Sequence, residues 1–357
     1  MKRQRRLESF FQAQREERTY FYLDWCAPPP YRAQWLSEKP ITPGITFEAE
    51  VQWIDLKLIV TLGARLPVPG EGEEEPRSES VSAPFISLLK SQLQKCVRRQ
   101  LTQKAMRTAR LLMTCDFSLF VRRLAIIMLE DVMLHDSLPA LVWLTAALSK
   151  GFRATHAIQT WLLSIVHYLC EERREAYWSQ SISNDTTQLA PARLKEAYRA
   201  AVEREAGRDM LLSLLFRRSY GGMPGDMAML MSFVSLLLSS EEAPQQHIAS
   251  TPLVALALEN VPPLRQEETE LCAVDFHCYP QMLMMLKREN PSLEEKSIRA
   301  AIWHHNSKFN SRVQVNQQER EKMEALRAVW RRLAWRVAWL QKEHIRVTWT
   351  CYANGIK

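Results

Sequence analysis

Residues 85–127 read FISLLKSQLQKCVRRQLTQKAMRTARLLMTCDFSLFVRRLAII. Apolar residues recur here three and four positions apart, as at Leu89, Leu93 and Val97, and helix-forming residues dominate. This spacing is typical of helices that bury one face, and it continues to about Trp178. The stretch therefore predicts four or five packed helices.

One segment near the N-terminus follows a different period. Residues 46–62 read TFEAEVQWIDLKLIVTL and alternate apolar with polar positions, with many β-branched residues. This pattern predicts one long strand, or two strands meeting near Trp53. The fold class expected is mainly α, a multi-helix body with a small β element near residues 46–62 and a flexible N-terminal arm.

Changes in composition divide the chain into five segments. Residues 67–84 combine Pro, Gly, Ser and an acidic run, which is typical of a linker that buries too little apolar surface to fold. The expected segments are a charged N-terminal arm (1–18), an aromatic and β segment (19–66), a flexible acidic linker (67–84), a helical domain (85–240) and a C-terminal helical region (241–357).

Composition narrows the class of protein. The 46% apolar and 24% charged fractions are those of an ordinary globular protein. A net charge of +7 favours a polyanionic partner, although 40 acidic residues are mixed among the 47 basic ones. The seven cysteines form no C-x-x-C pair, which favours a reducing compartment.

No signal peptide is seen, and no apolar run reaches the roughly 18–20 residues of a membrane span, so no membrane partner is expected.

The first eleven residues, MKRQRRLESFF, carry the most specific motif of the chain. One tight helical turn would place Leu7, Phe10 and Phe11 on one side as a single apolar plug. With Gln4, these residues match every defined position of Gln-x-x-aliphatic-x-x-aromatic-aromatic. The motif resembles the PCNA-interacting-protein (PIP) box of replication and repair proteins.

That resemblance implies a sliding clamp of the PCNA type as partner. Gln4 would occupy a small polar pocket of the clamp, and Leu7, Phe10 and Phe11 would fill the groove under its interdomain connector. It also implies a nuclear location, or a viral replication compartment, and a role in DNA replication or repair. The alternative is a chance amphipathic start that folds onto the body.

A second resemblance concerns residues 95–152. Arg122-Arg123-Leu124, with Glu130-Asp131-Val132 a short way on, looks like the helical region after the ATPase module of the replication-associated recombination protein A and Werner-helicase-interacting family. The chain has no G-x-x-x-x-G-K-[S/T] loop, so nucleotide hydrolysis is not carried over and no cofactor is expected. The alternative is a helical core whose charged residues form solvated or partly buried ion pairs.

Basic residues are concentrated between Lys90 and Arg123. On predicted helices some of them share a face that would meet phosphates, against the alternative of a solvated helix surface. The candidates for nucleic-acid binding are Lys95, Arg98, Arg99, Lys104, Arg107 and Arg110.

The predicted C-terminal helix, about 317–345, alternates arginine with Trp330, Trp335 and Trp339. Arginine beside exposed tryptophan can stack unpaired bases. Tryptophans at this spacing are more often core residues on which arginines stack, and we therefore expect them in the core.

Candidate metal ligands lie in the C-terminal third. Asp275 and His277 precede His304 and His305 by 27 to 30 positions, and these are side chains that zinc or a nuclease metal accepts. Their spacing matches no zinc module, so a buried structural turn is preferred, with no catalytic residue.

The sequence thus favours a non-enzymatic accessory or adaptor protein tethered to a sliding clamp, with DNA and other replication proteins as further partners. A clamp-tethered, metal-dependent nuclease is the alternative, and a structural subunit of a polymerase or clamp-loader assembly is a third reading.

Overall fold

The structure is a computed structural model of the 357-residue chain. It describes residues 17–26, 32–41, 44–65, 81–174, 191–239, 248–250 and 252–356. Eleven α-helices and four strands lie in these ranges, so the mainly α class is confirmed. Residues 1–16 of the expected N-terminal arm (1–18) and most of the expected linker lie outside the described residues, whereas Arg18 already belongs to the first strand.

The chain forms two compact units, and it passes between them more than once. The first takes the described parts of Met1–Val68, Asp136–Phe152 and Ser183–Ser250, and the second those of Pro69–His135, Arg153–Ile182 and Thr251–Lys357. The helices between residues 85 and 240, expected as one domain, are therefore divided between the two units.

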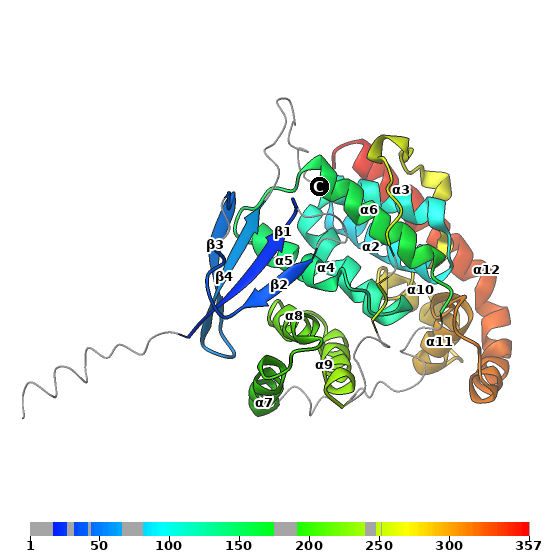
Figure 1. The fold of residues 1–357 in the computed structure, drawn as a ribbon. Coiled ribbons are helices and arrows are strands. Elements are labelled where there is room, and N and C mark those ends of the chain that lie inside the picture. Colours follow the sequence, from blue (N-terminus) through cyan, green and yellow to red (C-terminus); the bar gives the residue numbers. More distant parts are fainter. Residues whose placement is uncertain are drawn as a thin grey trace, which may run out of the picture. The chain divides into compact units, whose positions relative to one another are not determined.

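The first unit contains the sheet, whose strand order is β2-β1-β4-β3 (Figure 1). Its strands are β1 (Arg18–Asp24), β2 (Ala33–Leu36), β3 (Phe47–Trp53) and β4 (Leu58–Arg65). β1 pairs parallel with β4, and the other two pairings are antiparallel. The expected β element is thus two strands of a hairpin, which turns after Trp53, where Lys57 has a φ of 58°. The aromatic segment before it supplies β1 and β2.

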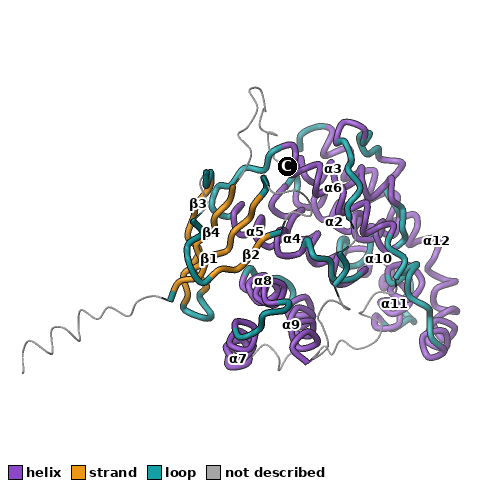
Figure 2. Tube along the Cα trace, in the orientation of Figure 1, coloured by secondary structure: helices purple, strands orange, loops and turns teal. Residues whose placement is uncertain are grey.

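Four helices belong to the same unit, and in Figure 2 they are the purple elements α5, α7, α8 and α9. Their bounds are α5 Leu138–Leu148, α7 Pro191–Val202, α8 Arg208–Ser219 and α9 Pro224–Ser239. The sequence predicts one helix from Pro191 to about Tyr220, which is wrong: Gly207 adopts a φ of 75°, a conformation that favours glycine and separates α7 from α8.

The core of the first unit is aromatic. The Trp35 ring stacks on Phe21 with centroids 4.1 Å apart and meets the edge of Phe216 at 5.2 Å. Its indole N–H donates to Ser213 Oγ at 3.0 Å, so the buried polar atom is satisfied. Trp143 of α5 donates to the carbonyl of Phe21 at 3.0 Å.

The second unit is helical. It contains α2 (Ala83–Arg98), α3 (Thr102–Cys115), α4 (Phe117–Ile127), the π-helical turn η1 (Met128–Val132), α6 (His156–Glu171), α10 (Pro280–Glu289), α11 (Glu295–Ile302), the π-helical turn η8 (Trp303–Ser307) and α12 (Gln317–Ala353). Short 3₁₀ turns occur at Leu258–Asn260, Gln266–Glu268 and Leu271–Ala273. The Asp116 carboxylate caps α4 by accepting from the Leu119 N–H at 2.9 Å.

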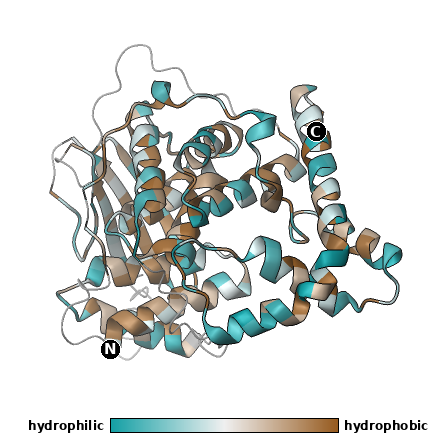
Figure 3. Cartoon of the chain, turned by 90° about the vertical axis from the view of Figure 1, so that its right-hand side faces the viewer, coloured by the Kyte–Doolittle hydropathy of each residue, from teal (hydrophilic) through white to brown (hydrophobic). Residues whose placement is uncertain are grey.

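Helix α12 joins the second unit along one face only. Leu333, Val337 and Leu340 pack in a cluster with Met282 of α10 and Ile298 of α11. Figure 3 shows hydrophilic and hydrophobic residues intermixed along the helix that ends near the label C. No helix among the described residues is both long enough and apolar enough to cross a membrane.

Candidate functional site

The four predicted clamp-binding residues, Gln4, Leu7, Phe10 and Phe11, lie outside the described residues. The described chain begins at Glu17, whose carbonyl accepts from the Ile59 N–H at 3.1 Å at the start of the sheet. The described chain therefore enters the first unit at the start of β1, a central strand of the sheet.

Two of the six predicted nucleic-acid-binding cations are buried. Lys95 is 5% exposed, and its Nζ lies 2.8 Å from Asp275 Oδ2. Arg98 is 8% exposed; it donates to Glu130 Oε1 at 2.8 Å and also pairs with Asp131. Because no phosphate can reach these two side chains, their expected place on a phosphate-facing surface is wrong.

The other four cations connect α2 and α3 to carbonyl and carboxylate groups of the same unit. Arg99 donates to the Asn306 carbonyl at 3.0 Å. The pairs for the rest are Lys104 with Glu270, Arg107 with Glu268, and Arg110 with the Val261 carbonyl. Each of these cations already has an acceptor within the unit, which a phosphate would have to displace.

Residues 95–152, the segment with the second family resemblance, contribute charged side chains to a mostly buried polar network. Gln94 Nε2 donates to Glu130 Oε2 at 2.9 Å and to Asp131 Oδ2 at 2.7 Å, and Arg123 donates to the Gln94 side-chain oxygen. Burial and the adjacent Asp131 carboxylate raise the pKa of Glu130. Burial alone would lower the pKa of Arg98, but the two carboxylates raise it above its ordinary value. The geometry is that of an ion-pair network that joins α2 to η1.

The candidate metal ligand Asp275 is fully engaged in protein contacts. One carboxylate oxygen pairs with Lys95, and the other accepts from the N–H groups of His277 at 2.9 Å and Cys278 at 3.3 Å. Burial lowers the pKa of His277, although Asp275 opposes the shift. This arrangement is a buried turn, the alternative that the sequence favoured.

The two other candidate ligands have separate partners. His304 Nδ1 lies 3.4 Å from Glu319 Oε2, and burial lowers the pKa of this imidazole. His305 Nε2 lies 3.1 Å from the Met323 carbonyl, and its ring stacks on Trp330. In the described ranges, no three His, Cys, Asp or Glu side chains come together as a metal site.

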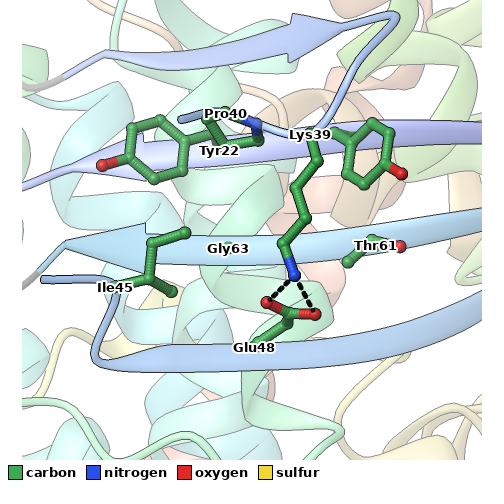
Figure 4. A pocket seen from close by; sticks show the side chains of 8 residues that line it. Tyr22, Lys39, Pro40, Ile45, Glu48, Thr61 and Gly63 are labelled. Atoms are coloured by element: carbon green, nitrogen blue, oxygen red, sulfur yellow. Dashed lines mark hydrogen bonds and ion pairs between the residues drawn. The ribbon is translucent and has the colours of Figure 1, made fainter. Parts of the chain in front are cut away.

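A small pocket lies on the sheet of the first unit (Figure 4). Figure 4 shows Lys39 reaching toward Glu48 beside Thr61 and Gly63. The Lys39 Nζ lies 2.8 Å from Glu48 Oε2. Its volume of about 10 Å³ leaves room for about one water molecule. The pocket is too small for an organic substrate.

A wider groove of about 340 Å³ lies between α7 and α9 in the same unit. Its lining residues are Arg193, Glu196, Ala197, Ala200, Met231, Val234, Ser235 and Leu238. Substrate sites combine an apolar wall with convergent polar groups. Most of this groove is apolar, and it carries no set of residues that identifies a reaction.

The aromatic residues of α12 differ from the expectation. Trp330 is partly buried and packs against the α10–α12 cluster, but Trp335 is 70% exposed and Trp339 is 48% exposed. The expectation that all three lie in the core is therefore wrong for the last two. Sequence alone contained a signal for this, because Leu333, Val337 and Leu340 also have helical spacing and are better candidates for the buried face.

The described fold and sites define a mainly α protein with a small mixed sheet, two units and an exposed aromatic helix face. The chain matches no family model, no curated protein and no solved structure among those compared.

Proposed function

We propose that this protein is a sliding-clamp-binding accessory or adaptor protein of DNA replication or repair. The observation that carries the proposal is the match of Gln4, Leu7, Phe10 and Phe11 to all defined positions of the PIP box. Adjacent aromatic anchors of this kind dominate binding energy when they enter a partner's apolar pocket.

The attachment of the arm supports this function. Phe11 lies six positions before Glu17, which pairs with β4. A chain extends by at most about 3.3–3.6 Å per residue, so the motif can extend roughly 20 Å from the sheet. This reach allows the motif to occupy a groove of a clamp without rearrangement of the first unit. The tether would then raise the concentration of the body beside DNA.

Calorimetric titration of the full-length protein into the sliding clamp of the same organism tests the proposal. A Phe10→Ala/Phe11→Ala variant should lose at least about 30-fold in affinity, since buried aromatic anchors contribute roughly 2 kcal/mol or more. A Gln12→Ala/Gln14→Ala variant is the matched control, because it changes the same arm outside the motif. Equal affinity of both variants, or no binding by the wild type, would contradict clamp binding.

A further inference from the structure

The outer face of α12 carries an unusual combination of side chains. Trp335 and Trp339 are 70% and 48% exposed, one helical turn apart. We call this face the tryptophan stripe, defined by Arg331, Arg332, Trp335, Trp339, Lys342 and Arg346. Large aromatic side chains that stay in solvent forgo the stabilisation that burial gives, and exposed patches of this kind mark interaction sites.

The charge of the stripe selects an anionic ligand. Its four cationic side chains all lie at exposed positions. Arg346 pairs with Glu343 at 2.6 Å, while no acidic partner is found for Arg331 or Lys342 among the described residues. A polyanion would neutralise these cations and release their counterions.

One of the two indoles is already held in a stacking geometry. The Arg336 guanidinium lies 4.2 Å from the centroid of the Trp339 ring. Glu289 of α10 fixes this arginine through hydrogen bonds of 2.6, 2.9 and 3.0 Å. A cation over one ring face helps orient the indole, so less conformational freedom is lost when a ligand stacks on it.

The spacing of the indoles favours unpaired bases over a duplex. One helical turn rises about 5.4 Å, whereas bases in a stacked strand are about 3.4 Å apart. Two bases separated by a turn of α12 are therefore unstacked from each other and can each stack on an indole. A duplex presents no free base faces to such a platform, because its bases are paired and stacked inside.

From these observations we propose that the tryptophan stripe of α12 binds single-stranded nucleic acid, with bases stacked on Trp335 and Trp339 and phosphates facing Arg331 and Lys342. This site is distinct from the six basic residues of α2 and α3, whose cations are used within the unit. It does not depend on the proposed clamp binding, so either proposal can fail alone.

The test is fluorescence anisotropy of a labelled oligothymidylate of about 16 nucleotides, titrated with the full-length protein without a clamp. Trp335→Ala/Trp339→Ala should bind at least about 30-fold more weakly, and Trp335→Phe/Trp339→Phe should keep most of the affinity. In Arg331→Ala/Lys342→Ala the dependence of log Kd on log salt should become shallower by about 1.4, since each phosphate contact on a single strand contributes roughly 0.7.

The matched control removes two exposed cations from the first unit. Lys195→Ala/Arg199→Ala loses the same charge on α7 and should bind as the wild type does. Unchanged affinity of the double tryptophan-to-alanine variant would overturn the proposal. So would equally tight binding of a duplex, or tryptophan-dependent binding to anionic vesicles or to a co-purifying protein in place of the oligonucleotide.

Discussion

Lys95 Nζ lies 2.8 Å from Asp275 Oδ2, and the two side chains are 6% and 3% exposed. The residues are 180 positions apart in the sequence, so this pair ties α2 to the segment that precedes α10. A buried charge without its partner is strongly destabilising, since the desolvation cost remains while the attraction is lost.

Either single substitution should therefore destabilise the second unit. We expect Lys95→Met and Asp275→Leu each to lower the free energy of unfolding by about 3–5 kcal/mol, as measured by urea denaturation. The double variant should lose much less than the sum, because neither charge is left unpaired.

The matched control for these variants is an exposed pair in the same unit. Arg299 and Glu295 also lie 2.8 Å apart, but about half of each side chain is exposed. Glu295→Ala should cost only about 0.3–0.5 kcal/mol. A similar effect at both pairs would show that burial does not set the strength of the Lys95–Asp275 contact.

The same pair should make stability depend on pH. Burial alone would raise the pKa of Asp275, but Lys95 and the hydrogen bonds to this carboxylate hold the pKa below its usual 3.8. Because the pKa of this carboxyl is lower in the folded state than in the unfolded state, its ionised form stabilises the folded state at every pH above the unfolded-state pKa. This stabilisation is lost as the pH falls through the folded-state pKa. The stability difference between wild type and Asp275→Asn should thus narrow when pH is lowered from about 5 to about 2. A constant difference across that range, in denaturation series at each pH, would contradict the assigned pKa.

Trp35 should be a position of the first unit that tolerates truncation poorly. Its ring stacks on Phe21, and its N–H bonds Ser213 in a fully enclosed environment. We expect Trp35→Ala to cost about 3–5 kcal/mol through the cavity it creates, measured by thermal and chemical denaturation. Because Trp35→Phe keeps most of the packing, it should lower the free energy of unfolding by less than Trp35→Ala does. It still leaves Ser213 Oγ without its donor, so some loss of stability is expected. If the phenylalanine variant is as unstable as the alanine one, the hydrogen bond contributes more than the packing.

Local pattern was sufficient to predict much of the fold. The spacing of Leu89, Leu93 and Val97 identified α2, and the alternation ending at Trp53 identified the β3–β4 pair. The break at Gly207 was missed because glycine interrupts a helix only when its backbone takes a positive φ, which the sequence does not reveal.

The candidate sites were harder to predict, because burial is decided by contacts between distant residues. Lys95 and Arg98 look like surface cations in the sequence, but their partners Asp275 and Asp131 lie far along the chain. Trp335 looks like a core residue, but Leu333 and Val337 already fill the buried face of α12. The division into two units has the same origin, since α5 leaves its sequence neighbours to pack with the sheet.

Cysteine reactivity should follow burial. Cys26 is exposed, whereas burial raises the pKa of Cys170 to about 12. Since the thiolate is the nucleophile, native protein treated with iodoacetamide near neutral pH should be alkylated at Cys26 first. Cys170 should react only after unfolding, which mass spectrometry of digested samples would show. Rapid native labelling of Cys170 would mean that α6 opens locally.

Arg312 should be needed for the second unit in a way that lysine cannot replace. Its guanidinium donates to the Val97 carbonyl at 2.8 Å, to the Glu172 carbonyl at 2.7 Å and to the carbonyls of Leu169 and Cys170. These acceptors lie at the C-terminal ends of α2 and α6, where the last carbonyls of a helix have no partner within the helix. One side chain thus caps two helices, whose C-terminal ends are about 70 residues apart in the sequence.

Replacing Arg312 by alanine leaves several nearly buried carbonyls without donors. We expect Arg312→Ala to lower the free energy of unfolding by about 2–4 kcal/mol, measured by urea denaturation. Arg312→Lys should recover less than half of the loss, because a single ammonium group cannot reproduce the planar fork that reaches both helices. Arg320→Ala, at an exposed position of α12, is the matched control and should change stability by less than about 0.5 kcal/mol. Full recovery by lysine would show that charge alone, and not the geometry of the guanidinium, holds α2 and α6 together.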